Sequence, residues 1–241
     1  MSYKRILAVG CSHGIYADQS AVDAVLKFRD SFKPQITIHL GDAIDCTAFM
    51  SSHMGKAQGD DVAPDVEGGI EFLRQLRPNY FLFGNHEDRL DRLACSKNEL
   101  VSYCAVTVLS HIESFCNRAK CKTIPYEGNE QDLTIGNVRF MHGTVYNVSA
   151  TRDHAEAFAP FKGALVHAHT HRAGQDTGRR GDSPIGFCVG TLGRKAAFGY
   201  AKCRRATLGW SQAFVYGYVN ETTSQLYLCQ RQNANEPWML P

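Results

Sequence analysis

The sequence predicts an α/β fold in which parallel strands carry the functional residues at their carboxyl ends. Short apolar runs of strand length alternate with amphipathic stretches of helical period along the first third of the chain. Clusters of polar residues follow these apolar runs directly. Because β-α-β units build parallel sheets whose sites lie beyond the carboxyl ends of the strands, we expect a functional site at one edge of the sheet.

Length and composition indicate one soluble domain. The 241 residues, of which 44% are apolar and 21% charged, suffice for a single domain spanning residues 1–241 with a proper core. No stretch approaches the roughly 18 to 20 apolar residues of a membrane span, and residues 1–9 lack the pattern of a signal peptide. The nine cysteines include no Cys-x-x-Cys pair, which argues against a disulfide framework or a zinc ribbon. We therefore expect a cytoplasmic protein without a membrane partner.

The first half of the chain predicts helices between the strands of a parallel sheet. Asp18 or Ser20 can cap the first helix, whose apolar residues recur at helical spacing before Pro34. Residues 46–66 are rich in Ser, Gly, Asp and Met without a clear period, so we expect a loop insertion near the mouth of the site. The expected elements are strand 6–10, the helix that Pro34 ends, strand 36–40, helix 66–76 and strand 80–83.

The second half of the chain predicts a long helical segment and then mostly strands. An amphipathic helical pattern covers residues 87–120 with a break near residues 97–98. Residues 136–137, a Gly-Asn pair, separate two β-rich runs, which predicts a hairpin over 132–141. The remaining expected elements are helix 152–158 and strands 164–166, 185–189, 213–219 and 225–230.

Residues suited to metal binding and acid–base chemistry follow five of the expected strands. Each cluster alone has an ordinary explanation; Gly84-Asn85-His86, for example, also fits a Gly-Asn turn with a chance histidine. Five such strand ends are hard to explain by core packing. Imidazole nitrogens and carboxylate or amide oxygens suit divalent and transition metals, and imidazole also serves as an acid or base. The clusters are Cys11 with His13, Asp42 with Asp45, Asn85 with His86, His142, and His169 with His171.

The order of these clusters resembles the calcineurin-like metallophosphoesterase superfamily. Its signature is Asp-x-His, Gly-Asp-x-x-Asp, Gly-Asn-His-Asp/Glu, a lone His and Gly-His-x-His. The resemblance spans roughly residues 6–171 and implies a four-layer αββα sandwich, in which two mixed β-sheets are flanked by helices. The matching blocks here are Cys11-Ser12-His13, Gly41-Asp42-Ala43-Ile44-Asp45, Gly84-Asn85-His86-Glu87, His142 and Ala168-His169-Thr170-His171.

The resemblance also implies a binuclear centre of divalent or transition metal ions, Zn, Fe or Mn. Two such ions lower the pKa of a shared water and hold phosphorus for in-line attack by the resulting hydroxide. His86 is then a catalytic group near the leaving oxygen, while Asp45 or Asp88 could orient a histidine. Asp88 equally fits a helix cap. The implied ligands are Cys11, His13, Asp42 and His171 for one metal and Asp42, Asn85, His142 and His169 for the other.

Two positions depart from the signature, because Cys11 stands where the family usually has Asp and Ala168 where it usually has Gly. A thiolate is softer than a carboxylate, so Cys11 as a ligand favours zinc or iron over magnesium, calcium or manganese. Alternatively, Cys11 is a small buried residue, and the enzyme works with one tightly bound metal. His13, Asp42 and His171 remain as ligands under both interpretations.

The substrate has to be inferred from other parts of the chain. Residues 161–210 contain nine basic and two acidic residues, an excess that suits a phosphate-rich ligand or a solvated basic face. Arg194 and Lys195 in this segment could grip phosphates while a nearby ring, from Phe198, Tyr200 or Trp210, stacks on a base. Arg89 could bind a phosphate oxygen or pair within its own helix.

We therefore expect a metal-dependent phosphoesterase with a slight preference for nucleic-acid or nucleotide phosphodiesters. The end of the basic, Gly-rich stretch 190–214 also resembles the tail of calcineurin-like proteins predicted in bacteriophage and prophage genomes. The alternatives are a phosphomonoesterase acting on phosphoproteins or small molecules, and a non-catalytic metal-binding scaffold. His53, in the expected insertion, could reach the substrate, whereas surface or core roles are expected for His39, His111, His154 and His167.

Overall fold

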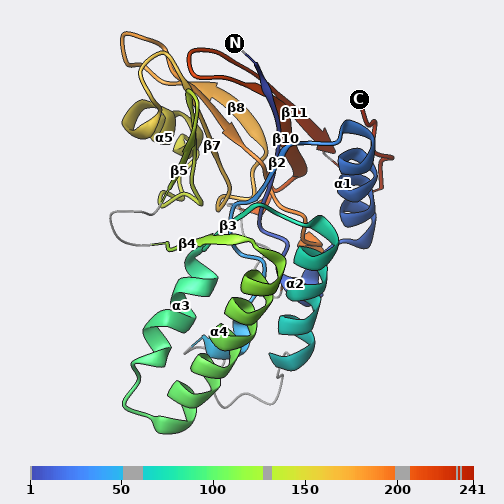
Figure 1. Cartoon of the computed structure of the whole chain (residues 1–241), viewed down its shortest axis with the longest axis vertical. Coiled ribbons are helices and arrows are strands. Elements are labelled where there is room, and N and C mark those ends of the chain that lie inside the picture. The colour runs from blue at the N-terminus through green and yellow to red at the C-terminus, as the bar shows by residue number, and fades with distance from the viewer. Residues whose placement is uncertain (1, 51–61, 127–131, 199–206, 232, 234) are drawn as a thin grey trace.

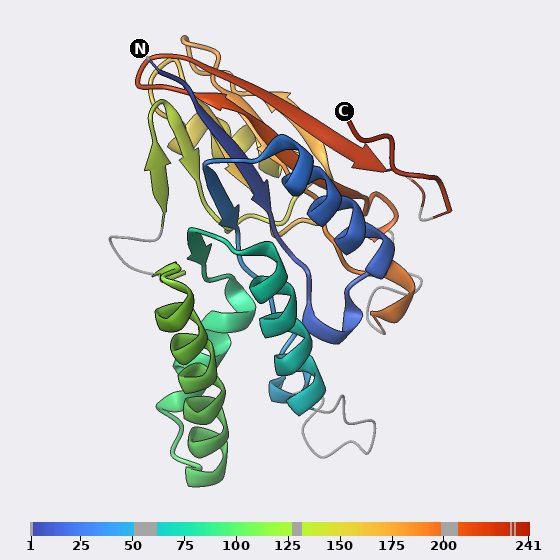
Figure 2. The same cartoon turned by 45° about the vertical axis from the view of Figure 1, so that its right-hand side comes forward.

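Two β-sheets face each other, with helices on their outer sides, in the computed structural model of the chain (Figure 1 and Figure 2). The structure describes residues 2–50, 62–126, 132–198, 207–231, 233 and 235–241. Both sheets combine parallel and antiparallel strand pairs. This arrangement confirms the expected α/β sandwich of two mixed sheets.

The first sheet has six strands in the order β11-β10-β1-β2-β3-β4. Strands β1 to β4 pair in parallel, while β10 runs antiparallel to β1 and forms a hairpin with β11. The parallel part of the sheet therefore presents the carboxyl ends of β1, β2 and β3 at one edge. The strands are β1 Lys4–Val9, β2 Ile36–His39, β3 Tyr80–Leu82, β4 Lys122–Ile124, β10 Gln212–Val219 and β11 Ser224–Arg231.

The second sheet has five strands in the order β5-β6-β7-β9-β8. Strands β6, β7 and β9 are parallel neighbours, and β5 and β8 close the two sides as antiparallel strands. Gly136 has a φ of 56°, the left-handed conformation that the expected hairpin turn requires. The strands are β5 Leu133–Ile135, β6 Val138–Phe140, β7 Ala164–His167, β8 Gly174–Thr177 and β9 Ile185–Cys188.

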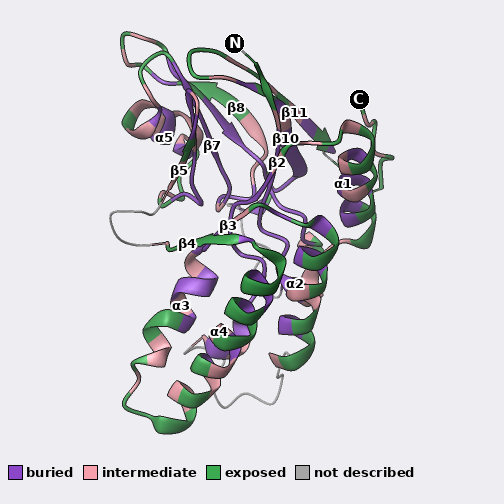
Figure 3. Cartoon of the chain, viewed as in Figure 1, coloured by how far each residue is buried: buried purple, intermediate pink, exposed green. Residues whose placement is uncertain are grey.

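Alternation along the strands explains how the sheets and helices are held together. Ile6 and Ala8 of β1 point to the other sheet and pack in one cluster with Phe140 and Val166, whereas Leu7 points to the helices. Figure 3 shows the buried strands between helices whose outer faces are exposed. The core between the sheets therefore fixes how the two sheet edges meet.

Helices α1 and α2 cover the outer face of the first sheet, α3 and α4 extend this layer past β3, and α5 packs on the second sheet. Asp18 caps α1 by accepting a hydrogen bond from the Ser20 backbone nitrogen at 2.9 Å. No helix in the described part of the chain has the length and apolar character needed to cross a bilayer. The helices are α1 Gln19–Phe32, α2 Val62–Leu76, α3 Asn85–Ala94, α4 Glu99–Ala119 and α5 Ala150–Phe158, with 3-10 turns at Gly14–Tyr16, Thr47–Phe49 and Lys195–Ala197.

The structure corrects the expected elements at three places. Helix α2 begins at Val62 rather than at 66, because Pro64 is compatible with a first helical turn. The expected insertion therefore ends earlier, and its part 51–61, with His53, lies outside the described residues. Strands β4 and β8 were not expected, since both are short and mostly exposed and lack a run of apolar residues.

Candidate metal centre

The polar clusters at the strand ends meet where the two sheets come together. The loops after β1 and β2 run side by side: the Cys11 backbone nitrogen donates to the Gly41 carbonyl at 2.8 Å, and that of His13 donates to the Asp42 carbonyl at 3.0 Å. Gly84 allows the loop after β3 to join them, because a Cβ there would collide with Asp42 Oδ1. His142, His169 and His171 arrive from the loops after β6 and β7.

Five residues of these clusters adopt left-handed backbone conformations. A non-glycine residue pays about 1 to 2 kcal/mol for this conformation, and such residues gather at functional sites. In this conformation the side chains of these residues, which lie on neighbouring loops, point toward the same small region, where their donor atoms cluster. They are Cys11, His13, Asp42, His169 and His171, with φ between 52° and 64°.

A first group of donors consists of Cys11, His13, Asp42 and His171. All four are buried, and their donor atoms lie within 4.8 Å of one another. The Nε2 atoms of His13 and His171 are 3.0 Å apart, so the two nitrogens either share one proton or face a common cation. Among the described residues, none gives the buried Nδ1 of His171 a hydrogen-bond partner. Sulfur, nitrogen and oxygen donors at this spacing fit a transition-metal ion.

A second group consists of Asp42, His142 and His169, with donor atoms within 4.8 Å of one another. His142 Nε2 lies 3.3 Å from Asp42 Oδ2, while its Nδ1 donates to the Leu40 carbonyl at 2.6 Å, which fixes the ring. The amide oxygen of Asn85 lies 3.2 Å from His142 Nε2 and 2.9 Å from His169 Nδ1. Asp42 therefore belongs to both groups and separates two places where a cation fits.

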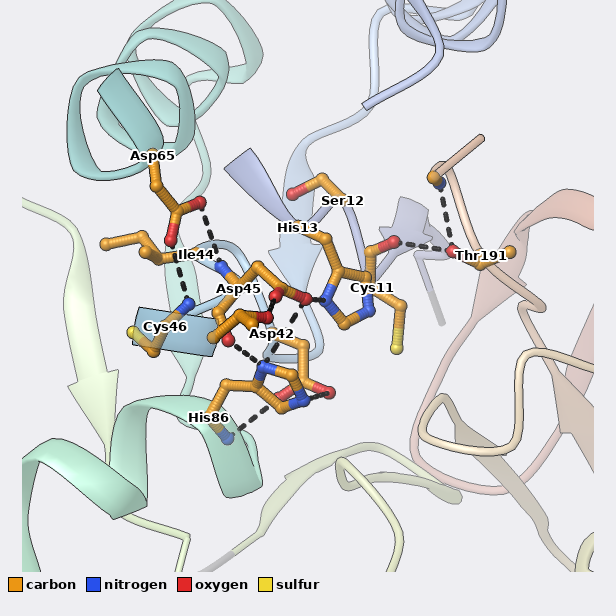
Figure 4. Close-up of polar contacts among 12 residues, drawn as sticks. Cys11, Ser12, His13, Asp42, Ile44, Asp45, Cys46, Asp65, His86 and Thr191 are labelled. Atoms are coloured by element: carbon orange, nitrogen blue, oxygen red, sulfur yellow. Dashed lines mark hydrogen bonds and ion pairs between the residues drawn. The ribbon is translucent and has the colours of Figure 1, made fainter. Parts of the chain in front are cut away.

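His13, Asp45 and His86 point toward one another beside Asp42 (Figure 4). His13 Nδ1 donates to Asp45 Oδ1 at 2.9 Å, which leaves its Nε2 directed at His171. His86 Nδ1 donates to the Asp45 carbonyl, and its Nε2 lies 3.8 Å from Asp42 Oδ2. Asp88, in contrast, lies in the first turn of α3 and pairs with Arg92 at 2.7 Å.

Burial and the neighbouring charges shape the electrostatics of the site. Burial favours a neutral Asp42, but His142 and His86 hold the pKa of this carboxyl well below its usual range. Burial also lowers the pKa of His13, but the hydrogen bond to Asp45 and the negative charges nearby raise it above its ordinary value. Burial, followed by the charge of Asp42, raises the pKa of the Cys11 thiol well above its ordinary value.

Two buried carboxylates support the site and have no role in the sequence-based hypothesis. Glu87 accepts backbone hydrogen bonds from Gly84 and Ala43 at 2.8 Å, from Asp42 at 2.9 Å and from Ile44 at 3.2 Å. Burial raises its pKa to about 6. The sequence pattern that could have identified this role is the capping box. Glu87 is the third residue of the helix that follows Gly84, and a Glu at this position commonly accepts a hydrogen bond from the backbone nitrogen of the cap residue.

Asp65 supports the neighbouring part of the same loop. It accepts from the Asp45 backbone nitrogen at 3.1 Å and from that of Cys46 at 2.8 Å, and burial raises its pKa to about 6. Asp65 lies in the first turn of α2. No pattern in the sequence points to Asp65, because the residues around it have no clear period.

The residues expected to bind the substrate lie in different surroundings. The half-buried Arg89 donates to the Cys46 carbonyl at 3.1 Å, close to His86. Arg194 is exposed and donates to the Ile15 carbonyl at 3.1 Å, and the half-exposed Lys195 begins the following 3-10 turn.

The expectation that Phe198 or Trp210 stacks on a base is wrong. The two rings are only 1% and 7% exposed, respectively. Phe198 packs edge-on against His13 with ring centroids 5.0 Å apart, and Trp210 against His171 at 4.3 Å. Both rings therefore belong to the wall of the site. Tyr200 and the basic residues Lys202, Arg204 and Arg205 lie outside the described residues.

Comparisons with known proteins agree with this geometry. The family model for the calcineurin-like phosphoesterases matches residues 4–173. A metallophosphoesterase from Sphaerobacter thermophilus has a similar structure, with 15% identity, a TM-score of 0.52, and coverage of 97% of this chain and 90% of that chain. For the phosphoesterase Yfce from E. coli the identity is 14% and the TM-score 0.41, with 95% and 98% covered. None of the curated proteins compared with the chain matches it. The likeness to the Sphaerobacter structure supports the fold.

Proposed function

Because the chain belongs to the calcineurin-like phosphoesterase family, we propose that it hydrolyses phosphoester bonds with the help of divalent metal ions. The observation that carries this proposal is the position of Asp42, a buried carboxylate that lies in both groups of donors. A carboxylate with two oxygens can bridge two cations that together hold a phosphoryl group. Burying a carboxylate costs free energy unless charged or polar groups compensate it, so a residue that served only the core would be apolar. Asp42 instead lies among six other potential metal ligands.

The donor sets fit two metal ions. The sulfur atom at the first position favours zinc or iron there, over manganese. When bound, the two ions polarise the phosphoryl oxygens and lower the pKa of water at the site. The proposed ligands are Cys11, His13, Asp42 and His171 for the first ion and Asp42, Asn85, His142 and His169 for the second.

The remaining side chains orient these ligands and the leaving group. Asp45 accepts the Nδ1 proton of His13 and so keeps the Nε2 lone pair directed into the site. His86 is held by the Asp45 carbonyl, so that its Nε2 faces Asp42 and remains available to the substrate. We assign His86 to the departing oxygen of the ester. As an imidazolium it has a second N–H at Nε2, which stabilises the developing charge by a hydrogen bond or passes its proton to that oxygen. Arg89, next to His86, can attract the negative phosphoester.

The substrate class we favour is a nucleotide or nucleic-acid phosphodiester. The exposed Arg194 and the half-exposed Lys195 support this preference, because both lie on the loop that places Phe198 against the centre. Phosphomonoester hydrolysis and a non-catalytic metal-binding role are the competing outcomes that the experiment below separates.

Turnover and metal content should be measured on the same samples. We expect the metal-supplemented protein to bind about two metals per chain by mass spectrometry and to hydrolyse bis-p-nitrophenyl phosphate. His86→Ala should lower kcat by about 100-fold or more while leaving the metal content unchanged, because His86 is not a proposed ligand. His111→Ala, at an exposed position of α4, serves as the control. Metal binding without turnover of diesters or monoesters would contradict the hydrolytic function and favour the non-catalytic metal-binding scaffold. Turnover of monoesters alone would exclude the preference for diesters.

A further inference from the structure

Tyr146 presents a fixed and partly open aromatic ring beside the metal centre. It lies in the loop after β6, four residues beyond His142, and its side chain is 44% exposed. Its hydroxyl accepts a hydrogen bond from the indole Nε1 of Trp210 at 3.2 Å. Its ring meets the ring of His169 edge-on, with centroids 5.7 Å apart and planes at 81°. The ring is thus in contact with a proposed metal ligand.

Arg172 covers one face of this ring. The guanidinium carbon lies 5.0 Å from the ring centroid, and NH1 donates to the Asn147 carbonyl at 2.9 Å, so the arginine ties the loop of Tyr146 to the segment after His171. Arg172 lies over one face of the ring, and the contacts with His169 and Trp210 hold the ring in place. With these contacts made, Tyr146 is still 44% exposed, so part of it remains open to solvent.

A ring that is held in place and partly exposed at the edge of the proposed phosphate-binding centre has the properties of a stacking surface. A cation held over one face of an aromatic ring immobilises it, so little conformational entropy is lost when a planar group stacks on the other face. Every nucleobase offers a π-face for such stacking. In a nucleotide the base is separated from the phosphate by one sugar, and Tyr146 is separated from the site of the phosphate by the single ring of His169.

We propose that Tyr146, held by Arg172 and Trp210, binds the base of a nucleotide substrate whose phosphate lies at the metal centre. This proposal rests on the proposed function, since the metal centre has to hold the phosphate. Tyr146 and Val148 leave apolar surface of the same loop exposed. Exposed apolar surface of this kind is common at ligand-binding sites, which agrees with the proposed role of Tyr146.

Paired ligands that differ only in the base test this proposal. The ligands are the methylenephosphonate analogues of adenosine 5′-monophosphate and of ribose 5-phosphate, in which carbon replaces the ester oxygen so that neither is hydrolysed. Isothermal titration calorimetry of the metal-loaded protein should give an affinity about tenfold higher for the adenosine analogue. Tyr146→Leu should reduce this ratio to about one and leave the affinity for the ribose analogue unchanged.

Two further variants separate the ring from other effects. Tyr146→Phe keeps the ring and should keep most of the preference, and Tyr103→Leu, at an exposed tyrosine of α4, should behave as the wild type. Equal affinities in the wild type, or a preference that survives in Tyr146→Leu, would overturn the proposal.

Turnover of bis-p-nitrophenyl phosphate, read on the same samples, separates this inference from the proposed function. Turnover without a preference for the ligand that carries a base would contradict base binding by Tyr146 and support the hydrolytic function. A base preference that depends on Tyr146, without turnover of any phosphoester, supports the base site and overturns the hydrolytic function.

Discussion

Cys11 is the residue at which this chain differs most in chemistry from the signature that its other blocks follow. It is fully buried, its sulfur lies within 4.8 Å of donor atoms of His13, Asp42 and His171, and its left-handed backbone is fixed by hydrogen bonds to Gly41 and Leu192. Asp tolerates the left-handed conformation well, so the position can accept either residue. The chemistry of the donor atom therefore decides which metal is preferred there.

Replacing Cys11 by Asp should change the metal preference without unfolding the protein. A carboxylate is a harder donor than a thiolate, so we expect Cys11→Asp to shift the bound metal from zinc or iron toward manganese by at least about tenfold. Mass spectrometry of protein grown with equal amounts of the three metals measures this shift. Cys95→Ser, at an exposed cysteine, is the matched control. An unchanged metal composition would show that Cys11 is not a ligand.

We expect Glu87, which is not a proposed metal ligand, to contribute substantially to the free energy of unfolding. Its carboxylate accepts four backbone hydrogen bonds in the interior, and a Gln side chain would offer one acceptor oxygen and direct an amide at the remaining donors. We expect Glu87→Gln to lower the free energy of unfolding by about 3 kcal/mol in denaturant titrations. Glu113→Gln, at an exposed position of α4, should change it by less than about 0.5 kcal/mol. A loss equal to that of the control would refute the role of Glu87.

At the scale of elements, helices and strands whose apolar residues recur at a regular spacing were predictable from the sequence. Strands made mostly of polar residues were not. Helix α1 follows from its cap and its spacing, and the hairpin of β5 and β6 follows from its Gly-Asn turn. Strand β8 has the sequence Gly-Gln-Asp-Thr and forms through its antiparallel pairing with β9. Such a strand carries no local signal, because tertiary pairing overrides a weak propensity.

The amino end of α1 depends on a charge. Asp18 caps the helix and also lies 3.3 Å from the guanidinium of Arg231 and 3.1 Å from Gln212 Nε2. Burial opposes its ionisation, but the hydrogen bonds from Ser20 and Gln212 and the charge of Arg231 hold the pKa of Asp18 below its usual range. A carboxyl whose pKa is lower in the folded state stabilises the fold above its unfolded pKa, and this contribution is lost as the pH falls through the folded value.

Asp18→Asn keeps a capping side chain and removes this charge. We expect the variant to be less stable than the wild type by about 1 kcal/mol at pH 7. The difference should shrink as the pH falls below about 4, where the carboxyl of the unfolded chain becomes protonated, and it is lost when the pH has passed the lower pKa of the folded state. Urea titrations at a series of pH values measure both effects. Asp23→Asn, on an exposed turn of the same helix, should show a smaller and flatter difference. A difference that does not change with pH would mean that the charge of Asp18 plays no part.

At the scale of the whole molecule, the sequence predicted which potential metal ligands the structure brings together, but not how the two sheets bring them together. The order of the clusters and the parallel strands before them place all of the donors at strand ends. Two features lie beyond such reasoning: the pairing of the two sheet edges, and the closure of the site by rings such as Tyr146 from an irregular loop. The first depends on contacts between residues far apart in the sequence, such as Ile6 and Phe140 in the core between the sheets. The second depends on the contacts of Tyr146 with His169, Arg172 and Trp210, which come from other loops.

This arrangement makes metal binding a link between the two sheets. His13 and Asp42 follow strands of the first sheet, and His142 and His171 follow strands of the second, so the donor groups exist only when both sheets are folded together. An ion that binds the folded chain and not the unfolded one stabilises it by about 2.7 kcal/mol at a free concentration of 100 times its dissociation constant.

Chelation of metal should therefore lower the Tm of the wild type, and added zinc should restore it, as measured by differential scanning calorimetry. His171→Ala removes the only proposed ligand of the first ion that comes from the second sheet, so most of the zinc-dependent shift that this ion causes should disappear. His111→Ala should keep the full shift, because His111 is an exposed side chain of α4. If zinc raises the Tm of His171→Ala as much as that of the wild type, the first ion does not connect the two sheets, and its stabilising effect belongs to the loops of the first sheet alone.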